Sequence, residues 1–147
     1  MVRARNIANC IGWMAFGLLS TIGTCKAAPD VVVIVSASNA TTTLSKNQIV
    51  DIFLGKANRF PDGSKVVPID QAEGSAERDE FYLKASGKSA PQLKAYWSKI
   101  IFTGRGQPPR DVANGVEVKK LIAENPNAIG YMDRSLADAS VKVLGEP

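Results

Sequence analysis

The stretch Asp30 to Ser36, DVVVIVS, decides the fold of this chain of 147 residues. Its apolar residues are β-branched and follow one another without polar alternation, which is typical of a strand that is covered on both faces. Pro29 precedes the run, and the polar residues SASNATTT follow from Ser36. We therefore predict that this run forms the first strand and that both of its faces are buried.

Toward the C-terminus, a helix is predicted to begin at Ser45, because Gln48 three residues later completes a capping box. Gly55 is expected to end this helix. The segment Lys65 to Asp70, KVVPID, is typical of a second strand. Since Pro68 has no N–H to donate to a ladder, we expect this strand to lie at a sheet edge or to end there.

Two more helices are predicted to follow, one from Ala76 to about Ser86 and one from Ser89 or Ala90 onward. No regular element is expected between Thr103 and Pro109. Asn114 then begins a fourth helix, and two short strands are predicted at Ala128–Met132 and Val141–Leu144. This order predicts an α/β three-layer sandwich, with parallel pairing where a helix intervenes.

Residues 1 to 27 have the three parts of an export signal. Two arginines lie within the first five residues, an apolar run extends from Cys10 to about Ile22, and small residues follow. The apolar run is shorter than the roughly 20 residues that a membrane-crossing helix needs. We predict cleavage after Ala27, which leaves a periplasmic domain over residues 28 to 147. The alternative is a lipoprotein anchored at Cys25, although Thr24 is not the small residue expected before a lipidated cysteine.

The charge of the chain lies partly in this leader. It holds three of the 18 basic residues and none of the 14 acidic ones, so the remainder has a net charge of +1. A nucleic-acid-binding surface needs clustered Lys and Arg in the folded part. Nucleic acid is therefore excluded as a partner, and no membrane span is expected in the mature protein.

Catalysis by the commonest means is excluded by composition. The chain has no histidine, and its two cysteines, Cys10 and Cys25, both lie in the leader. Zinc sites, histidine-based triads and thiol nucleophiles all need such residues. We interpret the remaining carboxylates, Asp51, Asp62, Asp70 and Glu73 among them, as surface charges and helix caps. No catalytic residue, metal site or cofactor is predicted.

A candidate anion site lies at Gly74-Ser75, which follows a strand and opens a helix. Free backbone N–H groups and the positive end of the helix dipole favour an anion there, and Ser75 adds a hydroxyl. The alternative is that Ser75 only caps its own helix. Arg78 lies in the first turn, where a cation indicates a nearby anion or a salt bridge. Arg105 and Arg110 are other sources of positive charge.

Four aromatic residues, Tyr96, Trp97, Phe102 and Tyr131, could form a stacking surface for a ligand. The first three fall at helix-face spacing, and Tyr131 lies in an apolar strand. We interpret the four as core residues.

Several segments, in order, resemble the substrate-binding protein of the ABC-type phosphate transporter. They are Leu44–Lys56 (LSKNQIVDIFLGK), Ile69–Phe81 (IDQAEGSAERDEF), Trp97, Phe102–Pro109 (FTGRGQPP) and Ala128–Tyr131 (AIGY). The resemblance implies a type II periplasmic-binding-protein fold, in which two lobes close on a ligand. The matched residues correspond to the second lobe alone.

In that family the second lobe supplies an arginine and then Ser-Gly-Thr at a helix start. The arginine position falls here on Gln71, the serine is kept as Ser75, and the next two positions fall on Ala76 and Glu77. Loss of a charge-assisted contact removes roughly 1.5–3 kcal/mol, and a carboxylate at Glu77 repels an anion if it points inward. The ligand-binding residues implied are Gln71, Gly74, Ser75, Ala76 and Arg78.

The function expected is that of an exported, non-catalytic protein similar to a phosphate transporter's substrate-binding protein. It would bind phosphate or another small anion weakly, and an ABC permease or another periplasmic protein is the expected partner. The alternative is a periplasmic protein–protein interaction module that has lost solute binding.

Overall fold

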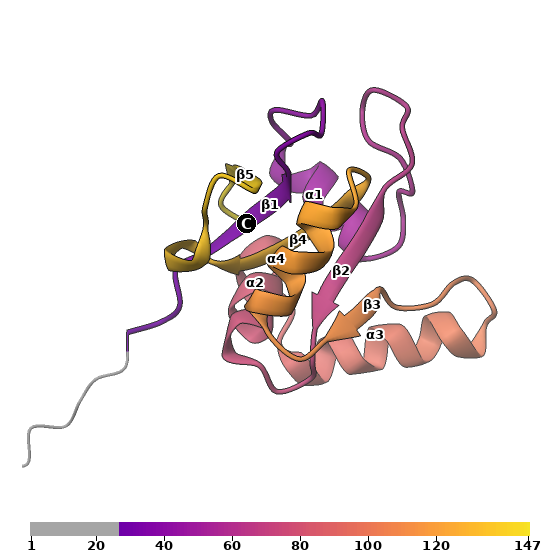
Figure 1. Cartoon of the computed structure of the whole chain (residues 1–147). Helices are drawn as coiled ribbons and strands as arrows, with labels where there is room; N and C mark the ends of the chain where they lie inside the picture. Colours follow the sequence, from indigo (N-terminus) through magenta and orange to yellow (C-terminus); the bar gives the residue numbers. More distant parts are fainter. Residues whose placement is uncertain (1–26) are drawn as a thin grey trace, which may run out of the picture.

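The structure, a computed structural model, describes residues 27–147 (Figure 1). The predicted leader lies outside the described residues, apart from Ala27. The elements in chain order are β1 (Val31–Ser36), α1 (Lys46–Phe53), β2 (Val67–Gln71), α2 (Ala76–Ser86), α3 (Ala90–Phe102), β3 (Arg110–Val112), α4 (Gly115–Glu124), β4 (Ala128–Asp133), the 3₁₀ turn η1 (Arg134–Leu136) and β5 (Val141–Gly145). Within residues 27–147, no helix is long and apolar enough to cross a membrane.

The strands form one sheet in the order β3-β2-β4-β1-β5. β1 is antiparallel to both of its neighbours, with Val33 opposite Tyr131 in β4 and opposite Gly145 in β5. β2 is parallel to β3 and to β4. All six residues of β1 are buried, which confirms the prediction of a strand covered on both faces.

Helices cover both faces of this sheet, so the predicted three-layer α/β sandwich is confirmed (Figure 1). On one face, Val31, Val33 and Val35 pack with apolar residues of α1, α2 and α3. On the other face, Val32 and Ile34 pack with α4. The two sides of the single apolar run DVVVIVS therefore belong to two separate cores.

Gly130 in β4 sets how closely α4 approaches the sheet. A methyl group at this position would lie 2.5 Å from Val118 Cγ1 and 2.7 Å from Ile122 Cδ1, both of which belong to buried side chains of α4. Real Cβ atoms are not found this close to other carbons, because the contact is strongly repulsive. The absence of a side chain at Gly130 thus permits the tight packing of the helix on the sheet.

The predicted helix caps are present. Ser45 and Gln48 form the capping box of α1, with Gln48 N donating to Ser45 Oγ at 3.3 Å and Ser45 N donating to Gln48 Oε1 at 2.8 Å. Ser75 is the N-cap of α2, and Gly87 ends that helix in the left-handed conformation, with φ at 68°.

Two predictions about local structure were wrong, and one strand was missed. β2 is an internal strand, although β3 pairs with it only from Ile69 onward, so Pro68 has a neighbouring strand on the β4 side alone. The strand β3 was not predicted at all. Phe102 does not join the core: its side chain lies at the end of α3 and is 93% exposed.

The two ends of the described chain meet at Arg134. Its Nε donates to Asp30 Oδ2 at 2.8 Å, immediately before β1, and its Nη2 donates to Glu146 Oε1 at 2.7 Å, immediately after β5. The domain is thus closed by polar contacts between residues that flank its first and last strands.

Candidate functional site

The candidate site lies where two parallel strands end and two helices begin. β2 ends at Gln71 just before α2, and β3 ends at Val112 just before α4. Because β2 and β3 are parallel, their carboxyl ends lie at the same edge of the sheet. Ligands of open α/β sheets bind in the crevice outside this edge, where helix N-termini present free N–H groups.

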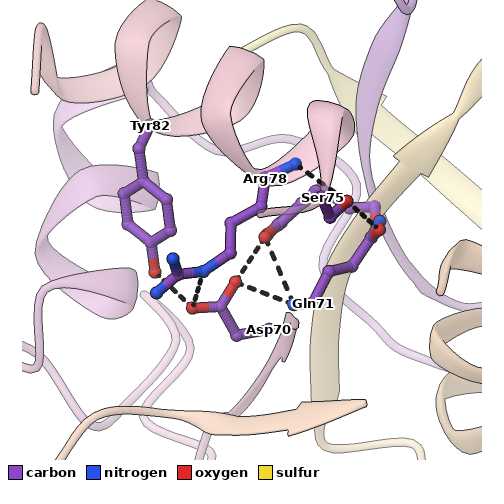
Figure 2. Close-up of polar contacts among 6 residues, drawn as sticks. Asp70, Gln71, Ser75, Arg78 and Tyr82 are labelled. Atoms are coloured by element: carbon purple, nitrogen blue, oxygen red, sulfur yellow. Dashed lines mark hydrogen bonds and ion pairs between the residues drawn. The ribbon is translucent and has the colours of Figure 1, made fainter. Parts of the chain in front are cut away.

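A buried carboxylate, Asp70, organises the end of β2 (Figure 2). Its side chain accepts from Gln71 N at 2.8 Å, from Tyr82 Oη at 2.9 Å and from Arg78 Nε at 3.3 Å, and it also accepts from the hydroxyl of Tyr131. Asp70 is only 2% exposed. The interpretation of Asp70 as a surface charge is therefore wrong, because four donors from β2, α2 and β4 hold it inside.

The groups around Asp70 keep their protons. Burial, followed by the negative charge of Asp70, raises the pKa of Tyr82 and that of Tyr131 well above 10. Burial is the largest single influence on the pKa of Arg78 and lowers it, but attraction to Asp70, the two tyrosine oxygens and the hydrogen bond to Asp70 together outweigh burial and raise that pKa. Two neutral phenols and one guanidinium thus share a single carboxylate, so the cluster is electrically balanced.

A second polar chain joins Gln71, Ser75 and Glu77. Ser75 Oγ donates to Gln71 Oε1 at 2.9 Å. Gln71 Nε2 donates to Glu77 Oε2 at 2.5 Å and to the carbonyl oxygen of Tyr131 at 3.2 Å. The amide of Gln71 is nearly fully buried and uses both of its ends, so it links the N-cap of α2 to the carboxylate in the first turn.

The carboxylate of Glu77 also lies against the start of α4. A methyl group on Gly115, the first residue of α4, would lie 3.0 Å from Glu77 Oε2. Helix N-termini attract negative charge. The Glu77 carboxylate therefore lies between the N-termini of α2 and α4, in a position where an anion is favoured.

Open backbone remains beside this carboxylate. Gly74 has φ at 89°, and a side chain added there would meet nothing within 4 Å. Ser75 N donates to Ala72 O and Arg78 N donates to Ser75 Oγ at 3.4 Å, whereas within the described residues the N–H groups of Ala76 and Glu77 have no acceptor. This is the donor arrangement that anions use at helix starts.

The structure brings four of the five predicted site residues together: Gln71, Gly74, Ser75 and Ala76. The fifth, Arg78, touches them only through its backbone N–H, because its guanidinium turns to Asp70 (Figure 2). The salt-bridge interpretation of Arg78 is thus confirmed. Neither Arg105 nor Arg110 makes a hydrogen bond or ion pair with the cluster, and both are exposed.

Sequence reasoning missed the cluster around Asp70. Arg78 and Tyr82 lie four residues apart in α2, and this spacing places both on the same helical face. That spacing, next to an acidic residue at the end of an apolar strand, was the available signal. Among residues 27–147, no group of three or more His, Cys, Asp or Glu side chains is arranged to hold a metal ion.

Solved structures provide the comparison with known proteins. The chain is similar to a candidate phosphate ABC transporter substrate-binding protein from Clostridium perfringens, crystallised with bound phosphate, at 23% identity and a TM-score of 0.64 over 79% of this chain and 44% of that chain. It is also similar to an ABC-type phosphate transport receptor from Vibrio cholerae (18% identity, TM-score 0.61, 81% and 48% covered) and to PstS from Borrelia burgdorferi (15%, 0.59, 80% and 47%). No family model matches the sequence, and no curated protein matches it.

The fold is therefore that of a single lobe of a periplasmic binding protein. The chain spans less than half the length of the solved structures it matches. More particularly, these structural neighbours are substrate-binding proteins of phosphate ABC transporters, which confirms the resemblance seen in the sequence.

Proposed function

We propose that this protein is an exported, non-catalytic protein that acts like a phosphate transporter's substrate-binding protein and holds phosphate or another small anion weakly. The proposed ligand residues are Gln71, Gly74, Ser75, Ala76 and Arg78. The observation that supports this proposal is the open backbone at the start of α2, where two N–H groups lack an acceptor within the described residues.

In the proposed complex, anion oxygens accept from the N–H groups of Ala76 and Glu77, and Gly74 leaves room for the approach. Ser75 Oγ adds a donor when it turns from Gln71 Oε1. The positive charge of Arg78 lies in the same first turn of α2 and contributes at longer range. No covalent bond has to break or form, so binding needs neither a histidine, which the chain lacks, nor a cysteine, which residues 28–147 lack.

Binding should be weak, because Glu77 competes for the same place. A full-length arginine at position 71 would add a charge-assisted contact of roughly 1.5–3 kcal/mol, and its absence reduces affinity about 10- to 150-fold. Repulsion from the Glu77 carboxylate reduces it further. We therefore expect a dissociation constant for phosphate in roughly the millimolar range.

Replacing Glu77 is the direct test. Phosphate titrations, followed by calorimetry and by amide chemical shifts in NMR, should show tighter binding in Glu77→Thr than in the unaltered protein, by about tenfold or more, since one variant removes the repulsion and adds a hydroxyl. Sulfate and acetate serve as competing anions. The largest amide shifts should fall on Ala76 and residue 77.

Ser75→Ala supplies the second arm, with Ser45→Ala as its matched control. The side chain of each serine caps a helix by accepting from the backbone N–H three residues later, so each substitution costs about 1 kcal/mol of stability. Only Ser75→Ala should weaken phosphate binding. If neither the unaltered protein nor Glu77→Thr responds to tens of millimolar phosphate, the anion-binding proposal is wrong.

Export and partnership belong to the same proposal. Cell fractionation should find the protein in the periplasm, and deletion of residues 1–27 should keep it in the cytoplasm. Cys25→Ser should not change this distribution; membrane retention that depends on Cys25 would instead support a lipoprotein. Crosslinking in the periplasm should capture an ABC permease, whose absence among the products would count against a transport role.

A further inference from the structure

A pocket lies beside the candidate site, between the start of α2, helix α3 and the loop before β3. Its volume is about 220 Å³, and it is lined by Glu73, Arg78, Lys94, Trp97, Ser98, Ile101 and Pro108. Pockets for drug-sized ligands have volumes of roughly 300–1,000 Å³, so this one suits a smaller molecule. Neither Ser75 nor Glu77 lines it.

Arg78 supplies the directed donors of this pocket. Its Nε donates to Asp70, its guanidinium carbon lies 5.5 Å from the centre of the Tyr82 ring, and only 13% of its side chain is exposed. Its two terminal nitrogens make no hydrogen bond to any described residue, and they are not sealed from solvent. A guanidinium has five N–H donors in a planar fork that matches a carboxylate, so an oriented fork with free ends is prepared for one.

The remainder of the pocket divides into a charged rim and an apolar wall. At the rim, Lys94 Nζ lies 3.2 Å from Glu73 Oε1, and both side chains are mostly exposed, so the pair can open at little cost. Trp97 is buried beneath, and within residues 27–147 its indole N–H has no partner. Ile101 and Pro108 are apolar and exposed.

We propose that this pocket binds a small organic acid, with its carboxylate between Arg78 and Lys94 and its apolar body against Trp97 and Ile101. An inorganic anion such as phosphate would satisfy the cations but leave the apolar wall wet. A neutral apolar molecule would cover the wall but leave the terminal nitrogens of Arg78 to water. The combination of both surfaces in one small pocket favours a molecule that carries both.

Trp97 makes the test direct. The chain has two tryptophans, Trp13 and Trp97, so the Trp13→Phe protein reports on this pocket alone. Titration with phenylacetate and with hexanoate should change its fluorescence in a saturable way. Phenylacetamide and inorganic phosphate should require at least about tenfold higher concentration for the same change, since each lacks one of the two matched parts.

Variants separate this pocket from the anion site at Ser75. Ser98→Phe fills the pocket while leaving Arg78 on Asp70, and it should abolish the response. Lys94→Met should weaken phenylacetate binding by about three- to tenfold, whereas Lys99→Met, on the same helix and outside the pocket, should not. Ser75→Ala should have no effect here, although it should weaken phosphate binding under the proposed function.

Circular dichroism and thermal melting should confirm that each variant is folded before titration. Equal responses to phenylacetate and phenylacetamide would overturn the proposal, as would undiminished binding by Ser98→Phe. A fluorescence response to phosphate at the same concentration as to phenylacetate would also overturn it, because it would identify a site for bare anions.

Discussion

Replacing Asp70 by Asn should destabilise the domain by about 3 kcal/mol. The new amide keeps one acceptor oxygen for Gln71 N and Tyr131, but its NH₂ group points at Arg78 Nε and Tyr82 Oη, which are both donors in the native cluster. Removing one partner of a buried ion pair costs roughly 3–5 kcal/mol. Arg78 keeps some contact with solvent, so the lower part of this range applies.

Urea unfolding, followed by Trp97 fluorescence and far-ultraviolet circular dichroism, should measure this loss. Combining Asp70→Asn with Arg78→Met completes a double-mutant cycle. In a protein that already carries Arg78→Met, Asp70→Asn leaves no unpaired guanidinium, so it should lower the free energy of unfolding only slightly. We expect a coupling free energy of about 1.5 kcal/mol or more between the two residues. Asp79→Asn, an exposed acidic residue on the same helix, is the control and should change stability by less than about 0.5 kcal/mol.

A loss below about 1 kcal/mol in Asp70→Asn, with a coupling near zero, would refute the reasoning. It would mean that Arg78 and the two phenols find solvent when the carboxylate is neutralised. In that case, the cluster would not be the anchor that joins the end of β2 to α2 and β4.

Three further predictions follow from the described contacts. Burial raises the pKa of Tyr82 and Tyr131, so the stability that their protonated phenols contribute is present below pH 10 and is lost as the pH rises above it. In a pH titration, the tyrosinate absorbance of these two residues, identified by comparison with Tyr→Phe variants, should appear only when the protein unfolds. Gly130→Ala should cost about 1–3 kcal/mol in urea unfolding through its clash with α4, whereas Gly106→Ala, whose nearest neighbour lies at 3.6 Å, should be close to neutral. Hydrogen bonds from Lys119 and Ser140 lower the pKa of Asp138, so the contribution of its carboxylate to stability is present above pH 4 and is lost as the pH falls below it. Asp138→Ala should therefore reduce the decline in the free energy of unfolding at acid pH, measured by urea unfolding at several pH values.

The main elements could be predicted from sequence because their patterns are local. Three such patterns each span only a few residues: the β-branched run of β1, the capping box at Ser45 and the glycine after α2. β3 could not be predicted in this way. Its three residues, Arg110 to Val112, are mostly exposed and show no alternation, so only pairing with β2 makes them a strand.

The position of the helix start at the candidate site could be predicted from the sequence, but the burial and contacts of its side chains could not. Spacing alone placed Ser75 at a helix start after a strand, which the structure bears out. It did not reveal that Asp70 is buried, because an acidic residue at a strand end usually faces water. The exposure of Phe102 was missed for a related reason: helical spacing gives a face, but only tertiary packing shows that α3 extends past its neighbours.

The pairing of β1 with two late strands affects the order and the rate of folding. This buried strand pairs only with β4 and β5, so the pairing of Val33 with Tyr131 and Gly145 needs residues that lie about 100 positions later in the chain. Contacts so distant along the chain make assembly slow, because a long loop must close before they form. During synthesis, β1 therefore cannot complete its native pairing until the residues of β4 and β5 have been made.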